Sequence, residues 1–225
     1  MKKEHIHILS IETSGKTCGV TLMRDNITLF SENITESNQH DKMLASLVQS
    51  AMKHSSNDFT NLDAIAVSAG PGSFTGLRIG TALAKGIVFD SGIKFIAVPT
   101  LDAIAWHYIG KLNLDEEKNI ISVIPSHKNL FYIKLFDKNF NTNGNIELIN
   151  PDNMRYFDAE NCIFVGSGAY IFHDDNKKEV SNELNSEIIA NYAYKLYLDN
   201  NFTDADDFIP MYAQDFIPKT TEETK

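Results

Sequence analysis

The sequence predicts an α/β protein of two lobes, each built as a mixed sheet with helices, with the second lobe degenerate. In the first lobe, three closely linked strand patterns precede alternating helix and strand patterns, in the order βββαβαβα. After a polar, acidic stretch at 112–119, which we take as the hinge, strand patterns restart more weakly. We therefore expect an N-terminal lobe over residues 1–110, a C-terminal lobe over 119–217 and a flexible tail over 218–225.

The strands of the first lobe are indicated by short apolar runs and by the turn formers between them. Runs at 7–13, 18–24 and 27–32 are joined by Ser14-Gly15-Lys16 and Asp25-Asn26, so an antiparallel meander is expected. The nearly continuous apolar run at 63–69 is typical of a strand covered on both faces. A further strand is predicted at 94–98, where Pro99 ends it, and a helix follows at 101–109.

Two long helices of this lobe carry more apolar surface than contact with one sheet requires. In the first, at 41–54, the apolar residues cover an arc of about 180°, against the roughly 100° stripe of a helix that docks on one sheet. The second, at about 73–89 with Ser73 as its N-cap, is apolar on nearly all sides. We therefore expect a partner chain to cover part of both helices.

Small residues recur every four positions along the second helix and predict a close helix contact. Glycine in a helix interior costs about 1 kcal/mol relative to alanine, and close approach of another helix would offset that cost. The residues that we expect to bind a partner are Met43, Leu44, Leu47, Val48, Ala51, Gly76, Gly80, Leu83, Ala84 and Ile87.

The second half repeats the first in a weaker form. Strands are expected at 120–125, 130–137, 146–149 and 162–165, and a helix at 183–198. The segment 204–225 is irregular, with two prolines. An internal duplication is a reasonable interpretation of this order.

Charge, cysteines and histidines exclude several classes of protein. Twenty Lys and Arg against thirty Asp and Glu give a net charge of −10, whereas proteins that coat nucleic acid are basic because they neutralise phosphates. Cys18 and Cys162 form neither a disulfide framework nor a zinc motif, and the seven histidines contain no HExxH, so we expect no metal site and no peptidase. No run approaches the roughly 20 apolar residues of a membrane span, and a cytoplasmic location is expected.

Two loops could bind an anion. The glycine-rich loop that opens with Gly70, Gly72 and Ser73 joins a strand to a helix N-terminus, but it lacks the Walker and GxGxxG patterns. Two interpretations of the glycine-rich loop stay open: the loop binds a nucleotide, or its glycines allow close packing. The segment 8–22 resembles the first phosphate loop of the actin-like ATPase superfamily, in which Glu12 would position a metal or, equally, cap the turn. Glu12, Ser14, Gly70, Gly72 and Ser73 are therefore candidates for a vestigial phosphate loop.

Over residues 6–106 the sequence is similar to the TsaB (YeaZ) family. The motifs that carry the resemblance are ILSIETS and CGVTL, His40 before the first long helix, SAGPGSFTGLRIG, and AVPTLDAIA. The resemblance implies a two-lobed actin-like (ribonuclease H-like) fold that has no independent catalysis and no cofactor. It also implies a direct heterodimer with TsaD, which transfers threonylcarbamoyl to the tRNA adenosine next to the anticodon, and an assembly that includes the ATPase TsaE.

In that family the first two long helices form the contact with TsaD and also serve in homodimers, so either pairing is implied here. The second half departs from the family pattern. Ile124-Pro125-Ser126-His127-Lys128 stands where an Ile-Asp-Ala-Arg-Arg-type segment is usual, and Pro210-Met211-Tyr212-Ala213-Gln214 where Pro-x-Tyr-Leu-Arg is usual. The alternative function is an ATPase or phosphotransferase that uses Glu12 and the glycine-rich loop, although no carboxylate opens the second half as that chemistry would require.

Overall fold

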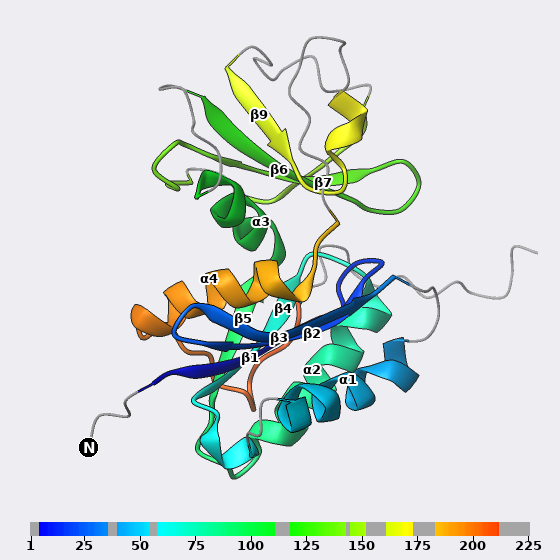
Figure 1. Cartoon of the computed structure of the whole chain (residues 1–225). Helices are drawn as coiled ribbons and strands as arrows, with labels where there is room; N and C mark the ends of the chain where they lie inside the picture. Colours follow the sequence, from blue (N-terminus) through cyan, green and yellow to red (C-terminus); the bar gives the residue numbers. More distant parts are fainter. Residues whose placement is uncertain are drawn as a thin grey trace, which may run out of the picture.

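The computed structural model describes residues 5–35, 40–54, 58–110, 118–142, 145–151, 161–172 and 183–211. It has the predicted α/β architecture of two mixed sheets with helices. Figure 1 shows the layers: the sheet of the second lobe, then α3 (Thr100–Ile109) and α4 (Ser186–Leu198), then the sheet of the first lobe, then α1 (His40–His54) and α2 (Phe74–Val88).

The first sheet confirms the predicted meander and its parallel extension. Its strands are β1 (His7–Glu12), β2 (Cys18–Arg24), β3 (Ile27–Ile34), β4 (Ala64–Gly70) and β5 (Lys94–Pro99), in the order β3-β2-β1-β4-β5. β1 and β3 are antiparallel to β2, whereas β4 is parallel to both β1 and β5. Asp25 and Asn26 form the β2–β3 turn with φ of 47° and 65°, a region that Asp and Asn tolerate better than most residues.

Both faces of this sheet are covered, which explains its continuous apolar runs. Leu9, Ile11 and Val67 belong to the core on the side of α1 and α2, whereas Ile8 and Ala66 belong to the core shared with α3 and α4. Alternate residues of one strand therefore serve two different cores, and a strand in that position needs apolar residues at every place.

Within the described residues, the second sheet repeats the order of the first four strands of the first sheet. Its strands are β6 (Asn119–Pro125), β7 (Phe131–Phe136), β8 (Glu147–Ile149) and β9 (Cys162–Val165), in the order β8-β7-β6-β9. The first three form an antiparallel meander, and β9 is parallel to β6 as β4 is to β1. The same topology in both lobes supports the internal duplication. The 3₁₀ turn Ala169–Phe172 follows β9.

The structure corrects the expected boundary of the second lobe, because α4 lies on the first sheet. The Ser10 hydroxyl donates to the carbonyl of Ser186, at 2.7 Å, and Asn33 Oδ1 accepts from the backbone N–H of Ser186, at 2.9 Å. Thr203 also pairs with β5, so the chain after α4 stays with the first lobe. The physical reason is that α1 and α2 cover only one face of this sheet, and the other face needs a helix from elsewhere. The expected tail at 218–225 lies outside the described residues.

Within the described ranges, no helix is both long enough and apolar enough to cross a membrane.

Candidate functional site

The glycine-rich loop and the β1–β2 turn pack directly against each other. The backbone N–H of Ser73 donates to the carbonyl of Ser14, at 2.7 Å, and a Cβ placed on Gly72 would lie 2.5 Å from that carbonyl oxygen. Inside α2, a Cβ on Gly76 would lie 1.9 Å from the carbonyl oxygen of Thr13. The structure thus brings the predicted residues of the two loops together, and these contacts favour close packing as the reason for the glycines.

The side chain of Glu12 folds back onto the β1–β2 turn and bonds to it. Its side chain is fully buried, and Oε1 accepts hydrogen bonds from the N–H of Ser14 (2.6 Å), the hydroxyl of Ser14 (2.7 Å) and the N–H of Gly15 (3.1 Å). Burial raises the pKa of Glu12 to about 7, although the hydrogen bonds from Ser14 and Gly15 oppose the shift. The carboxylate caps its own turn, which was one of the two roles expected for it.

The glycine-rich loop ends at the N-terminus of α2, where Ser73 is confirmed as the N-cap. Ser73 precedes α2, and its side chain accepts a hydrogen bond from the N–H of Gly76, at 3.3 Å. The free N–H groups that make a helix N-terminus attractive to anions are therefore partly used within the chain.

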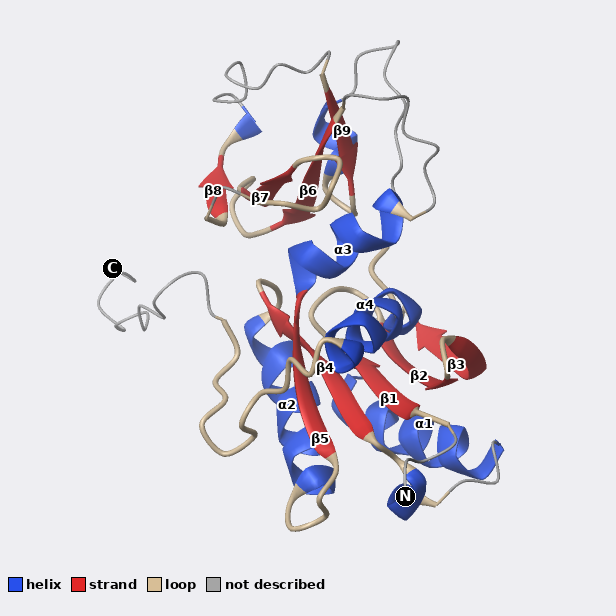
Figure 2. Cartoon of the chain, turned by 90° about the vertical axis from the view of Figure 1, so that its left-hand side faces the viewer, coloured by secondary structure: helices blue, strands red, loops and turns tan. Residues whose placement is uncertain are grey.

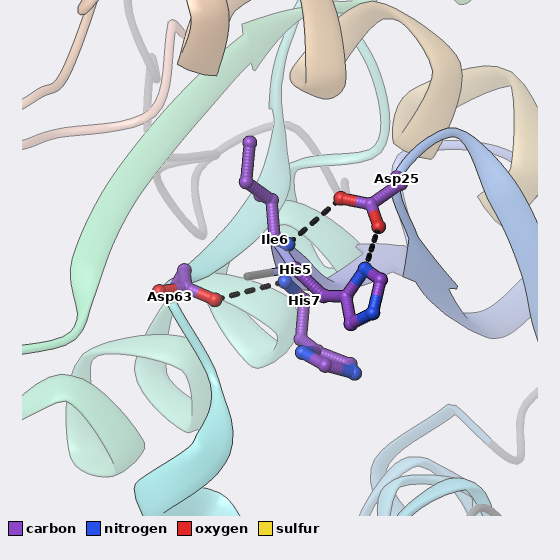
Figure 3. Close-up of polar contacts among 5 residues, drawn as sticks. All are labelled: His5, Ile6, His7, Asp25 and Asp63. Carbon is purple, nitrogen blue, oxygen red and sulfur yellow. Dashed lines mark hydrogen bonds and ion pairs between the residues drawn. The ribbon is translucent and has the colours of Figure 1, made fainter. Parts of the chain in front are cut away.

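Near the N-terminus, two aspartate carboxylates accept hydrogen bonds from the backbone at the start of β1. Figure 3 shows Asp25 accepting from the N–H of Ile6 (2.8 Å) and binding the ring of His5, while Asp63 accepts from the N–H of His7 (2.9 Å). The Ile6 N–H and His5 hold the pKa of Asp25 below its ordinary value. The two carboxylates lie on opposite sides of the strand in Figure 3 and fix the start of β1. In the part of the chain that is described, no three His, Cys, Asp or Glu side chains are grouped so that they could hold a metal ion.

Most of the residues expected to bind a partner are buried inside this chain. Seven of the ten have little or no exposed surface: Leu44, Leu47, Val48, Ala51, Gly76, Gly80 and Ala84. The wide apolar arc of α1 packs on the first sheet and on α2, and Gly76 and Gly80 pack against Thr13. The expectation that these seven residues contact a partner directly is therefore wrong. Met43, Leu83 and Ile87 are half-buried, and for them the expectation stays a prediction.

A different set of small and polar residues faces outward from α1 and α2. We call it the outer helix face. It consists of Lys42, Ala45, Ser46 and Gln49 on α1 and of Thr75, Arg78, Ala82 and Gly86 on α2, all of them exposed. On α2 these positions recur at the spacing of three or four residues that defines one side of a helix. Phe89 continues the line just after α2 and is 79% exposed.

Gly86 is the residue of this face that the sequence interpretation missed. A Cβ placed on it would have no atom of the chain within 4 Å, unlike Gly76 and Gly80. The signal was present, because a glycine in a helix interior needs a reason at any position. The four-residue spacing of the other two glycines directed attention to the buried side.

Two lobes whose sheets share the same strand order define an actin-like ATPase-type fold. The family model described as "TsaD: tRNA N6-adenosine threonylcarbamoyltransferase" matches residues 33–146, about half of the chain. The "tRNA threonylcarbamoyladenosine biosynthesis protein TsaB" of Haemophilus influenzae is 28% identical over 130 residues, which are 57% of this chain and 53% of that protein. The protein of the same description from Escherichia coli is 33% identical over 100 residues, 44% of this chain and 43% of that protein.

The chain belongs to this family of tRNA threonylcarbamoyladenosine biosynthesis proteins, and within it to TsaB (YeaZ). The matches span about half the length of these curated relatives. The structure titled "YeaZ from Pseudomonas aeruginosa" has the same fold, with a TM-score of 0.76 over 92% of this chain and 99% of that chain at 20% identity.

Proposed function

We propose that this chain is a non-catalytic subunit that binds TsaD and activates it for transfer of threonylcarbamoyl to the tRNA adenosine next to the anticodon. It would act in the cytoplasm, in an assembly that includes the ATPase TsaE. The names of the curated relatives support the pathway. With a net charge of −10 the chain would contact tRNA only through its partners.

The observation that carries the proposal is the exposed glycine in the last turn of α2. Glycine lowers intrinsic helix stability relative to alanine by up to about 1 kcal/mol, and no atom in the described part of the chain lies close enough to Gly86 to require it. Close approach of a second backbone would offset that cost. The neighbouring exposed residues Ala82, Ala45 and Ser46 are also small, so a helix of TsaD could approach both α1 and α2 closely.

Binding would shift TsaD towards its competent conformation. A subunit without its own catalytic site can act in this way if it binds one conformation of its partner better than the other. A second copy of this chain is the alternative occupant of the same surface.

A substitution at Gly86 tests the docking surface. Gly86→Glu places a charged side chain on the outer helix face, and we expect binding to TsaD to weaken at least about tenfold by titration calorimetry. Leu198→Glu is the matched control, since Leu198 is 56% exposed on α4, on the opposite side of the sheet. Equal binding by both variants and the unaltered chain would refute this surface.

Reconstitution tests the activity itself. Purified TsaD, TsaE and tRNA are assayed for modified adenosine with and without this chain. We expect modified adenosine to form faster when the chain is present. Product formation that is unaffected by its addition would contradict the activating role.

The alternative of an ATPase or phosphotransferase requires an open anion site at Glu12 and the glycine-rich loop. The contacts of Ser14 with Ser73 and with Glu12 itself oppose it, because they use groups that would bind phosphate. Calorimetry with magnesium-ATP on the isolated chain decides the question. Micromolar binding with turnover would favour the alternative over the subunit role.

A further inference from the structure

The segment after α4 continues along the first lobe and contacts β4, β5 and α2. We call residues 201–211 the C-terminal strap. In Figure 2 it leaves the end of α4 and runs as a tan loop beside β5 and α2. Pro210 is buried and Phe208 is half-buried, whereas most of the other strap residues are exposed.

The first attachment is to the edge strand β5. The N–H of Thr203 donates to the carbonyl of Phe95, at 2.9 Å, and the ring of Phe208 lies 5.2 Å from that of Phe95. The strap therefore covers part of a strand edge that would otherwise present unpaired backbone groups.

The other two attachments lie near the two ends of α2. Lys85 Nζ, in the last turn of the helix, donates to the carbonyl of Asp206, at 3.2 Å. Before the helix, the N–H of Met211 donates to the carbonyl of Ala69, at 2.7 Å. Gly70 has a φ of +100°, and a Cβ there would lie 2.5 Å from the carbonyl oxygen of Met211, so only glycine admits the strap at this point.

Helix α2 needs such external support more than most helices. It contains three glycines in fifteen residues, at positions 76, 80 and 86, and each lowers its intrinsic stability. Its position then depends more on tertiary contacts, and the strap supplies one near each end.

We propose that the C-terminal strap is a clasp that positions α2, and that its release weakens the docking of TsaD without touching TsaD. This proposal rests on the proposed function. The strap holds few fully buried residues, so it opens more readily than the core. An opened strap leaves a smaller fraction of molecules with α2 in the docking position, and the apparent affinity falls by that fraction.

Phe208→Ala tests the clasp, with Phe172→Ala as the matched control. Both residues are half-buried phenylalanines beside another aromatic ring, but Phe172 stacks on Phe164 in the second lobe. We expect hydrogen exchange of the α2 amides to accelerate about tenfold in Phe208→Ala alone, and the affinity for TsaD to fall by a similar factor. Met211→Pro, which removes the N–H that bonds Ala69 and also fixes φ at this position, should act in the same direction.

The two measurements separate the two hypotheses. Unchanged α2 exchange in both strap variants would overturn the clasp, whether or not TsaD binds. Faster α2 exchange in a chain that never binds TsaD would support the clasp and refute the proposed function. Equal acceleration by Phe172→Ala would mean that only global stability had changed, and it would also overturn the clasp.

Discussion

The buried carboxyl group of Glu12 makes the stability of this protein depend on pH in an unusual direction. Carboxylates that are paired or hydrogen-bonded in the folded state usually have a lowered pKa, whereas burial raises the pKa of Glu12 from its ordinary 4.5 to about 7. The folded chain therefore holds this proton more tightly than the unfolded chain does. Between these two pKa values the folded state binds more protons, so the free energy of unfolding falls as the pH rises.

The magnitude follows from the difference between the two pKa values. A pKa of about 7 against 4.5, at about 1.36 kcal/mol per pH unit, corresponds to about 3 kcal/mol. Below about pH 4.5 the group is protonated in both states and costs nothing. Above about pH 8 the loss is complete and the curve is flat with respect to this group.

Glu12→Gln removes the titration and keeps the oxygen that accepts from Ser14 and Gly15. We expect urea unfolding from about pH 4.5 to about pH 8.5 to show the unaltered chain losing about 3 kcal/mol relative to Glu12→Gln. Glu32→Gln removes the same charge from an exposed position of β3 and controls for net charge. If the curves of the unaltered chain and Glu12→Gln run parallel across this range, the reasoning about the buried carboxyl group is refuted.

Three further substitutions test the packing. Gly86→Ala should stabilise the isolated chain by about 0.5–1 kcal/mol in urea unfolding, because the site is open, and a loss of stability would show that Gly86 is needed within the chain. Gly76→Ala should instead lower the free energy of unfolding by about 2 kcal/mol or more, because its Cβ would meet the Thr13 carbonyl oxygen at 1.9 Å. Thermal unfolding measures this change, and an unchanged midpoint contradicts that packing. Asp102→Asn should cost about 2 kcal/mol, since Lys134 Nζ binds both its carboxylate oxygens at 2.9 Å with little exposure, and a neutral effect would mean that this link between α3 and β7 contributes nothing.

Local signals predicted the elements because local physics forms them. Asp25-Asn26 adopts a tight turn whatever surrounds it, and Ser73 caps the helix that it precedes. The continuous apolar run of β4 predicted burial on both faces, which the two cores confirm. In each case the responsible residues lie within a few positions of one another.

The tertiary structure decided which surfaces are free. Gly76 and Gly86 are the same residue in the same helix, yet a Cβ on one would meet Thr13 and a Cβ on the other would meet no atom of the described residues. Likewise, the apolar pattern of α4 predicted a helix but not the sheet that it covers. Composition and periodicity fixed the elements and the amount of apolar surface, because those depend on neighbours along the chain. The partner of each surface depends on residues far apart in sequence, such as Asn33 and Ser186, which only the folded arrangement brings together.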